Sequence, residues 1–346
     1  MRRRLTGLIA VLALAACAPV QQSAWTAPPG FAGPRLEAAD FVSFDGAKLA
    51  LQSWGPAASD PWAVIIGVHG MDDDSNAFEL AGPYWAEHGI QTIAYDQRGF
   101  GRSPEHGLWP GDGLMIEDLR TLSGLVRARY PHAIVAVAGE SLGASVAIEA
   151  FASNDPPAAD RLILLSPAVW GWSTQPPTYT APLWVAAHLD PGWVIEPPRW
   201  VTKDRYASDN IEELRRMASD PYQIWGTRVD AIYGLVDSMQ KAADALPRVR
   251  VPVAFLMGAH DQIIPPRPMK LAARGLKASD RSAFYANGWH LLLVDKQRDV
   301  VFADVESFVR DPSAPLPSGA PIVPGALTAA NTSPALAQAA VCAASR

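Results

Sequence analysis

Residues Gly139-Glu140-Ser141-Leu142-Gly143 place one serine between two glycines, at the junction of an apolar run and a helical pattern. Residues 134–138 are apolar and partly β-branched, which is typical of a buried strand, and residues 144–152 favour a helix. Glycines here permit a sharp strand-to-helix turn that exposes the serine hydroxyl. We therefore predict a nucleophilic Ser141. The alternative is a glycine-rich turn in which the serine only caps a helix. This alternative does not explain why the motif lies between a predicted buried strand and a predicted helix.

Outward from this turn, short apolar runs alternate with helical patterns. Strands are predicted at 63–68, 91–95, 133–138, 161–165, 251–257 and 282–285, and helices at 76–88, 115–129, 142–152 and 299–309. A hairpin with a tight turn at Asp45-Gly46, joining 41–44 to 48–54, precedes them. The alternation predicts an α/β fold whose mainly parallel central sheet carries helices on both faces.

The alternation of predicted strands and helices stops between residues 168 and 242. This stretch is rich in proline and has helical patterns at 210–218 and 226–242. We predict a helical cap inserted over the carboxyl ends of the sheet. Aromatic rings in a cap either line an acyl pocket, lie at a membrane interface or form the cap's own core, and the sequence leaves this open. Six of the twelve tryptophans fall in this segment: Trp170, Trp172, Trp184, Trp193, Trp200 and Trp225.

A serine hydroxyl becomes a good nucleophile when a base takes its proton and a third group orients that base. His290 follows the last predicted strand, where a loop presents it. Asp261 follows the strand at 251–257 and so lies at the carboxyl ends of the strands. The other candidate, Asp280, precedes a strand and so lies at the amino ends. We predict Ser141 as nucleophile, His290 as general base and Asp261 as the orienting acid, cleaving esters through an acyl-enzyme.

The tetrahedral intermediate of this chemistry needs two N–H donors. We assign one to the backbone of Leu142 and the other to Met71, in the His69-Gly70-Met71 turn after strand 63–68. The three aspartates at 72–74 either cap the next helix or repel anionic substrates. No histidine or cysteine spacing fits a metal site, and this chemistry needs none, so we expect no metal and no other cofactor.

The amino-terminal residues indicate export. Three arginines at 2–4 precede an apolar stretch at 5–16 that suits a signal peptide and is too short to span a bilayer. Leu14-Ala15-Ala16-Cys17 resembles the lipobox of bacterial lipoproteins, which implies cleavage before Cys17 and acylation of its thiol. We expect a signal peptide at 1–16, a tether at 17–36 and anchoring to a bacterial membrane, the periplasmic face of the outer membrane being one destination. An ordinary signal peptide is the alternative.

The remaining composition sets the domain limits. Residues 37–310 form the predicted catalytic domain, and 49% hydrophobic residues allow a large core. Residues 311–346 are rich in Pro, Ala and Ser, which predicts a disordered tail. A net charge of −6 gives no basic surface for nucleic acid. The one further cysteine, Cys342, has no partner for a disulfide if Cys17 is acylated. The oligomeric state stays open.

Five motifs together resemble the monoacylglycerol lipase and lysophospholipase branch of the α/β-hydrolases, which is serine aminopeptidase S33-like. They are His69-Gly70-Met71, residues 96–103, residues 139–143, residues 258–265 and Trp289-His290, within a resemblance spanning 41–310. Two positions depart from the family pattern, since Asp72 and Ala144 stand where glycine is frequent.

The resemblance implies an α/β-hydrolase fold, a structural role for Arg98 and a lipid or other apolar ester as substrate. We expect lysophospholipid ahead of monoacylglycerol. The alternatives are a small-ester carboxylesterase, an acyltransferase on the same triad and, last, a non-catalytic anchored binding protein.

Overall fold

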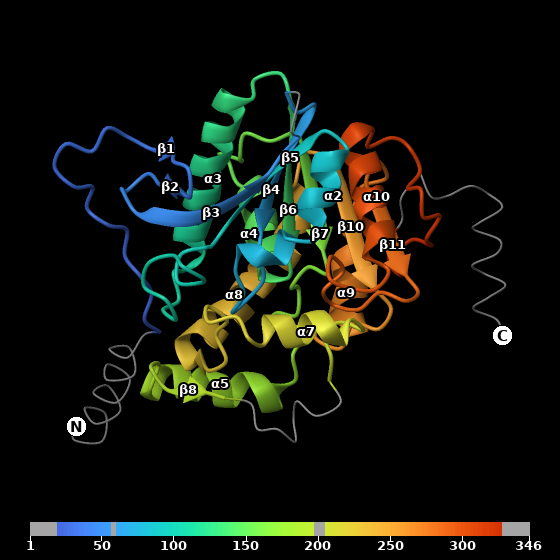
Figure 1. The fold of residues 1–346 in the computed structure, drawn as a ribbon. Helices are drawn as coiled ribbons and strands as arrows, with labels where there is room; N and C mark the ends of the chain where they lie inside the picture. Colours follow the sequence, from blue (N-terminus) through green and yellow to red (C-terminus); the bar gives the residue numbers. More distant parts are fainter. Residues whose placement is uncertain (1–18, 57–59, 197–204, 327–346) are drawn as a thin grey trace, which may run out of the picture.

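A nine-stranded sheet forms the centre of the protein (Figure 1), with strand order β1-β2-β3-β5-β4-β6-β7-β10-β11. The computed structural model describes residues 19–56, 60–196 and 205–326, so Cys17, Trp200 and Cys342 lie outside it. The strands are β1 (Arg35–Leu36), β2 (Asp40–Val42), β3 (Lys48–Trp54), β4 (Ala63–Val68), β5 (Ile90–Tyr95), β6 (Ile134–Glu140), β7 (Arg161–Leu165), β10 (Val253–Gly258) and β11 (Arg281–Tyr285).

The strands from β5 to β11 in this order run parallel, whereas β1, β2 and β3 pair antiparallel at one side. Successive residues of a strand face opposite sides. Val135 and Val137 therefore join the core beneath one set of helices, and Ala136 and Ala138 join the core on the other side. This architecture confirms the predicted α/β-hydrolase fold.

Helices cover both faces of the sheet. On one face lie α3 (Asp112–Arg129), α4 (Leu142–Phe151), α8 (Val229–Ala245) and α9 (Pro266–Ala273). On the other lie α2 (Ala81–Glu87) and α10 (Arg298–Arg310), as Figure 1 shows. Among the helices that the structure describes, none combines the length and the hydropathy needed to cross a bilayer.

The cap lies over one end of the sheet (Figure 1). It consists of α5 (Pro177–Leu189), α7 (Ile211–Met217) and a small antiparallel sheet of β8 (Val194–Ile195) and β9 (Thr227–Arg228). The predicted cap limit at residue 242 falls inside α8. Val236 and Met239 of that helix belong to the main core, so α8 joins the cap to the sheet-covering layer.

Several element predictions differ from the structure, mostly where prolines occur. The sequence predicted no helix at α5 or α9, yet Pro177 and Pro266 stand in the first turns of these helices. A first-turn proline is tolerated because the N–H it lacks would have no intrahelical partner. The predicted helix 76–88 divides into a short 3-10 helix, η1 (Ser75–Phe78), and α2. The hairpin turn spans 43–47 rather than two residues.

The structure contradicts the predicted disorder for residues 311–326. Val323 is fully buried and donates its N–H to Ser282 Oγ (3.2 Å), and Phe284 donates to the carbonyl of Pro321 (2.7 Å). Strand β11 is an edge of the sheet, and an uncovered edge presents unpaired backbone groups. The segment after α10 covers that edge, a role that composition alone does not reveal.

The predicted tether also contacts the domain. Gln22 donates its backbone N–H to the carbonyl of Trp109 (3.0 Å) and its side-chain amide to that of Leu108 (2.7 Å). The backbone N–H of Trp25 donates to Asp45 Oδ2 (2.8 Å). Trp109 lies against Gly234 of α8, so residues 22–25 are held at the side of the domain that carries the cap.

Arg98 occupies the structural position that the resemblance implied. Its guanidinium is fully buried and pairs with Asp45 Oδ2 and Asp118 Oδ1, each at 2.7 Å. These carboxylates come from the β2–β3 turn and from α3, so Arg98 ties three segments together. A buried guanidinium needs this full pairing because an unpaired buried charge is strongly destabilising.

Candidate active site

Ser141 lies at the carboxyl end of β6, on the turn that enters α4. Its backbone adopts φ 51° and ψ −114°, a left-handed conformation that costs a non-glycine residue energy. Strand β7 and the loop that follows it hold Ser141 there, since Ser141 donates its N–H to the carbonyl of Leu165 (3.0 Å) and its carbonyl accepts from Ala168 (3.0 Å). A side chain at Gly143 would clash with the carbonyl of Val68, so that glycine allows α4 to approach β4.

His290 and Asp261 are joined by a hydrogen bond of 2.9 Å between Nδ1 and Oδ2. The other carboxylate oxygen of Asp261 accepts from the N–H groups of Ile263 (2.8 Å) and Ile264 (2.9 Å). Both side chains are almost fully buried. An Nδ1–H that donates to the carboxylate leaves Nε2 as a proton acceptor, the tautomer that a general base needs.

The loops that carry these two residues are bonded to each other. Ala259 donates its N–H to Tyr285 (2.9 Å) and His260 donates to Gly288 (2.8 Å). Asp280, the rival acid, accepts the N–H groups of Val253 and Lys277 at the amino end of β10. The structure therefore brings Asp261 to His290 and places Asp280 at the opposite edge of the sheet.

The turn after β4 lies directly against the serine. A Cβ built on Gly70 would stand 3.3 Å from the Cβ of Ser141. The buried ring of His69 accepts the N–H of Gln97 at Nε2 (2.8 Å) and donates from Nδ1 to the carbonyl of Gly70 (2.7 Å). Burial lowers the pKa of His69, in accord with this neutral form. The ring thus orients the peptide group whose N–H belongs to Met71, a role that the sequence reasoning did not identify.

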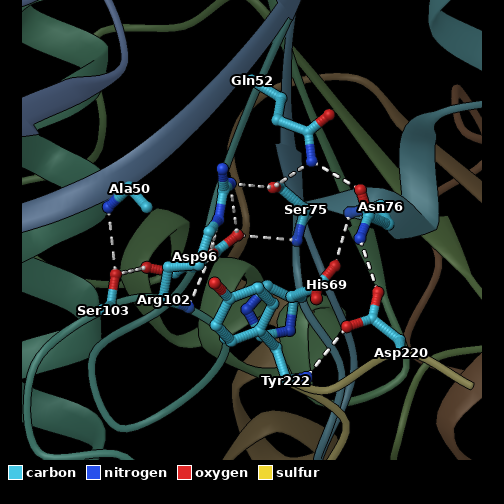
Figure 2. A network of polar contacts seen from close by, with 12 residues as sticks. Ala50, Gln52, His69, Ser75, Asn76, Asp96, Arg102, Ser103, Asp220 and Tyr222 are labelled. Atoms are coloured by element: carbon cyan, nitrogen blue, oxygen red, sulfur yellow. Dashed lines mark hydrogen bonds and ion pairs between the residues drawn. The ribbon is translucent and has the colours of Figure 1, made fainter.

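A polar network supports this turn from behind (Figure 2). Asp96 accepts the N–H of Ser75 and the guanidinium of Arg102, each at 2.9 Å. Burial alone would raise the pKa of Asp96, but the hydrogen bonds from Arg102 and Ser75 outweigh it and lower the pKa. Gln52 of β3 donates to Asn76 Oδ1 (2.5 Å), so the network also reaches the neighbouring strand.

The three aspartates of 72–74 have different environments. Asp74 accepts the N–H of Asn76 (2.7 Å) and caps η1, as one of the two interpretations predicted. Asp72 bonds to the cap through Thr227 Oγ1 (2.5 Å). Asp73 lines the cavity beside Ser141, and burial raises its pKa to about 7.

Two more buried carboxyl groups flank the site. Burial raises the pKa of Glu140, next to the serine, well above its usual value, and Asp73 and Asp295 raise it further. Burial also raises the pKa of Asp295 to about 6. Asp295 accepts the N–H of Trp289 (2.7 Å) and the hydroxyl of Ser208 (2.7 Å), so it holds the residue before His290 in place.

A cavity of about 860 Å³ opens onto Ser141 and His290 between the sheet and the cap. Met71 lies in its wall, and most of the remaining lining is apolar, including Leu183, Met217, Leu235, Val236 and Met239. Of the cap tryptophans, Trp170, Trp193 and Trp225 line the cavity, Trp172 packs against the core and Trp184 is exposed. Trp193 and Trp225 are also more than half exposed, so the described cap tryptophans do not form one buried cap core.

Comparisons with known proteins identify the family to which the chain belongs. The family described as serine aminopeptidase, S33, matches residues 59–297. The monoacylglycerol lipase of Mycolicibacterium smegmatis is 25% identical over 275 residues, covering 78% of this chain and 95% of that protein. The monoglyceride lipase of Rattus norvegicus is 24% identical over 264 residues, covering 75% and 85%.

Solved structures share the fold. The monoacylglycerol lipase of Paleococcus ferrophilus superposes with a TM-score of 0.60 at 19% identity, covering 76% of this chain and 99% of that one. A carboxyl esterase from Bacillus coagulans gives a TM-score of 0.63 at 21% identity, covering 78% and 96%. With the family match spanning most of the domain, the chain belongs to the serine aminopeptidase S33 family of α/β-hydrolases and is a serine hydrolase of the esterase and lipase group.

Proposed function

We propose that this protein hydrolyses single-chain lipid esters, with monoacylglycerol as the first substrate to test. The observation that carries the proposal is the apolar cavity of about 860 Å³ that reaches Ser141 and His290. Its volume lies in the range that holds a small organic ligand. Each CH₂ buried in such a cavity contributes about 0.8 kcal/mol, so a long acyl chain binds far better than acetate.

The proposed chemistry assigns one role to each residue. Ser141 Oγ bonds to the ester carbonyl carbon while its proton passes to Nε2 of His290, and Asp261 stabilises the imidazolium. The carbonyl oxygen takes the negative charge and accepts the N–H groups of Met71 and Leu142. Collapse expels the alcohol, which takes the proton from His290. A water molecule then attacks the acyl-enzyme by the same route and releases the fatty acid.

The environment of Asp73 favours a neutral head group over a phosphate. Asp73 is the member of the 72–74 run that lines the cavity, and it lies beside Met71 and Ser141. A glycerol hydroxyl forms a hydrogen bond with this carboxyl group whether it is protonated or ionised, whereas the ionised form repels a phosphodiester. This argument, together with relatives named as monoacylglycerol lipases, reverses the order that we expected from the sequence.

An apolar surface around the cap supports action at a membrane. Of α5, Ala187 is buried, while Tyr179, Trp184, Val185 and Leu189 are each at least 43% exposed. Such a surface is typical of sites that contact apolar partners or lipid. The lipobox at Cys17 supports the same location, because the described chain begins on the side of the domain that carries the cap (Figure 1).

An acyl-length series tests the substrate class. With p-nitrophenyl esters from acetyl to dodecanoyl, kcat/KM is expected to rise steeply with chain length. Fatty acid release from 1-monooleoylglycerol is then compared with release from lysophosphatidylcholine and lysophosphatidylethanolamine, with the Ser141→Ala variant as the blank. A flat length profile without fatty acid release would instead identify a small-ester carboxylesterase.

The anchor needs a separate measurement. We propose that the mature protein begins at an acylated Cys17 and is held at a bacterial membrane. Mass spectrometry of the amino-terminal peptide is expected to find a diacylated or triacylated cysteine. An unmodified Cys17, or cleavage at another bond, would refute the anchor and leave an ordinary exported enzyme.

A further inference from the structure

Residues 220–227 of the cap, which we call the strap, cross the turn that carries Met71. Three hydrogen bonds from the strap converge on Asp72. Its carbonyl accepts from the side-chain amide of Gln223 (2.7 Å) and the backbone N–H of Ile224 (3.1 Å), and its carboxylate accepts from Thr227 Oγ1 (2.5 Å). A fourth bond, Asn76 Nδ2 to Asp220 Oδ2 (2.8 Å), joins the strap to η1 (Figure 2).

Asp72 immediately follows the residue that we assign as oxyanion donor. Its φ of 62° is a left-handed conformation that costs a non-glycine residue energy, and the bonds from the strap hold it there. On the other side of Met71, the ring of His69 holds the carbonyl of Gly70. The turn is therefore fixed from the body of the protein at one end and from the cap at the other.

The strap also forms part of the cavity wall. Gln223 and Trp225 line the cavity, together with Met217 at the end of the preceding helix. A chain that fills the cavity presses on the same segment that positions Asp72. The strap thus connects the part of the site that contacts an acyl group with the part that stabilises the oxyanion.

We propose that Asp72 is a positioning residue through which the strap couples occupancy of the cavity to the alignment of the Met71 N–H. An acyl chain long enough to contact the strap stabilises the productive position of the turn. The enzyme consequently gains kcat, and not merely affinity, as the acyl chain lengthens. This inference rests on the proposed ester hydrolysis and deepens it.

The test compares kcat and KM for p-nitrophenyl acetate and octanoate. In the wild type, octanoate is expected to have a kcat several-fold above acetate. Thr227→Val removes the hydroxyl that bonds Asp72, so kcat for octanoate should fall about tenfold with KM changed less than twofold, and the advantage over acetate should disappear. Thr227→Ser retains the hydroxyl and should restore both. Thr178→Val, an exposed threonine of α5, is the matched control.

A second variant separates coupling from folding. Asp72→Gly removes the carboxylate and also relieves the left-handed backbone, so a loss of kcat cannot come from added strain. It should reproduce the Thr227→Val result. A kcat within twofold of wild type on both esters, for either variant, would overturn the coupling while leaving the hydrolase assignment intact. Failure of the hydrolase assignment would instead appear as no Ser141-dependent turnover in the wild type.

Discussion

Nδ1 of His290 donates to one oxygen of Asp261, and the second oxygen of that carboxylate accepts two backbone N–H groups. This arrangement predicts the result of Asp261→Asn. The amide oxygen would keep the two N–H groups of Ile263 and Ile264, which turns the amide NH₂ toward His290. Nδ1 must then accept, its proton moves to Nε2, and the ring can no longer take a proton from Ser141.

We therefore expect Asp261→Asn to lower kcat by about 10³–10⁴ with little change in thermal stability. The measurement is steady-state hydrolysis of p-nitrophenyl butyrate beside a melting curve. Asp280→Asn is the control and should keep kcat within a fewfold, because Asp280 lies at the other edge of the sheet. Equal losses in the two variants would contradict the assignment of the acid.

The strained backbone of Ser141 predicts an unusual order of stability between two inactive variants. Ser141→Gly and Ser141→Ala both lack the hydroxyl, but glycine adopts φ 51° without a Cβ penalty. The glycine variant should have a free energy of unfolding higher by about 1 kcal/mol, measured by urea denaturation.

Ser123 offers the opposite control, since it lies inside α3. Ser123→Gly should have a free energy of unfolding about 1 kcal/mol lower than that of Ser123→Ala, because glycine is a poor helix former. If glycine were also destabilising at position 141, backbone strain at the nucleophile would not determine the order of stability of the two variants.

The sequence was sufficient to predict the sheet and the loop residues at the carboxyl ends of its strands. Buried parallel strands are continuous apolar runs, and a loop residue that follows such a run must lie at those ends, which is why Asp261 and Asp280 were distinguishable. The contacts of Asp72 with Thr227 were not predictable. They join a turn of the main domain to a position 155 residues later in the chain. That position lies in the cap, where the sequence shows no strand pattern from which the path of the chain could be predicted.

The tail and α5 show a second reason why a prediction from the sequence fails. Residues 311–326 lack helical and strand patterns, and their composition alone therefore predicted disorder. Their order depends on the open edge of β11, a feature of the assembled sheet. No helix was predicted at α5, a proline-rich segment in which Pro177 stands in the first turn and Pro182 lies inside the helix.

The buried carboxyl of Asp73 predicts a pH-dependent stability. Burial raises its pKa from the usual 3.8 to about 7, so between these values the folded state binds a proton that the unfolded state has released. Stability therefore falls as pH rises through this window, by at most about 1.4 kcal/mol per pH unit from this group. Asp73→Asn removes the titration and should gain stability relative to wild type between pH 4.5 and pH 7.5.

Urea denaturation at these two pH values measures the difference. Asp311→Asn serves as the comparison, because a hydrogen bond from the Ser313 hydroxyl lowers the pKa of that exposed carboxyl. Its stabilising contribution is complete above the usual pKa of 3.8, so its effect should not change between pH 4.5 and pH 7.5. The same pH-independent behaviour in Asp73→Asn would show that Asp73 stays ionised in the folded protein.

The cavity wall at α8 predicts how the acyl-length preference can be changed. Val236 lines the cavity and is 3% exposed. In Val236→Phe the added ring occupies space that the end of a long acyl chain would use. Excluding two methylenes costs about 1.6 kcal/mol, or roughly 15-fold in kcat/KM. Dodecanoyl ester hydrolysis should fall by about this factor, while butyryl ester hydrolysis stays within threefold of wild type. Val300→Phe makes the same replacement at an exposed position of α10 and should leave the whole series unchanged. An equal loss at every chain length would mean that the ring distorts the site as a whole, and would argue against an acyl chain bound along α8.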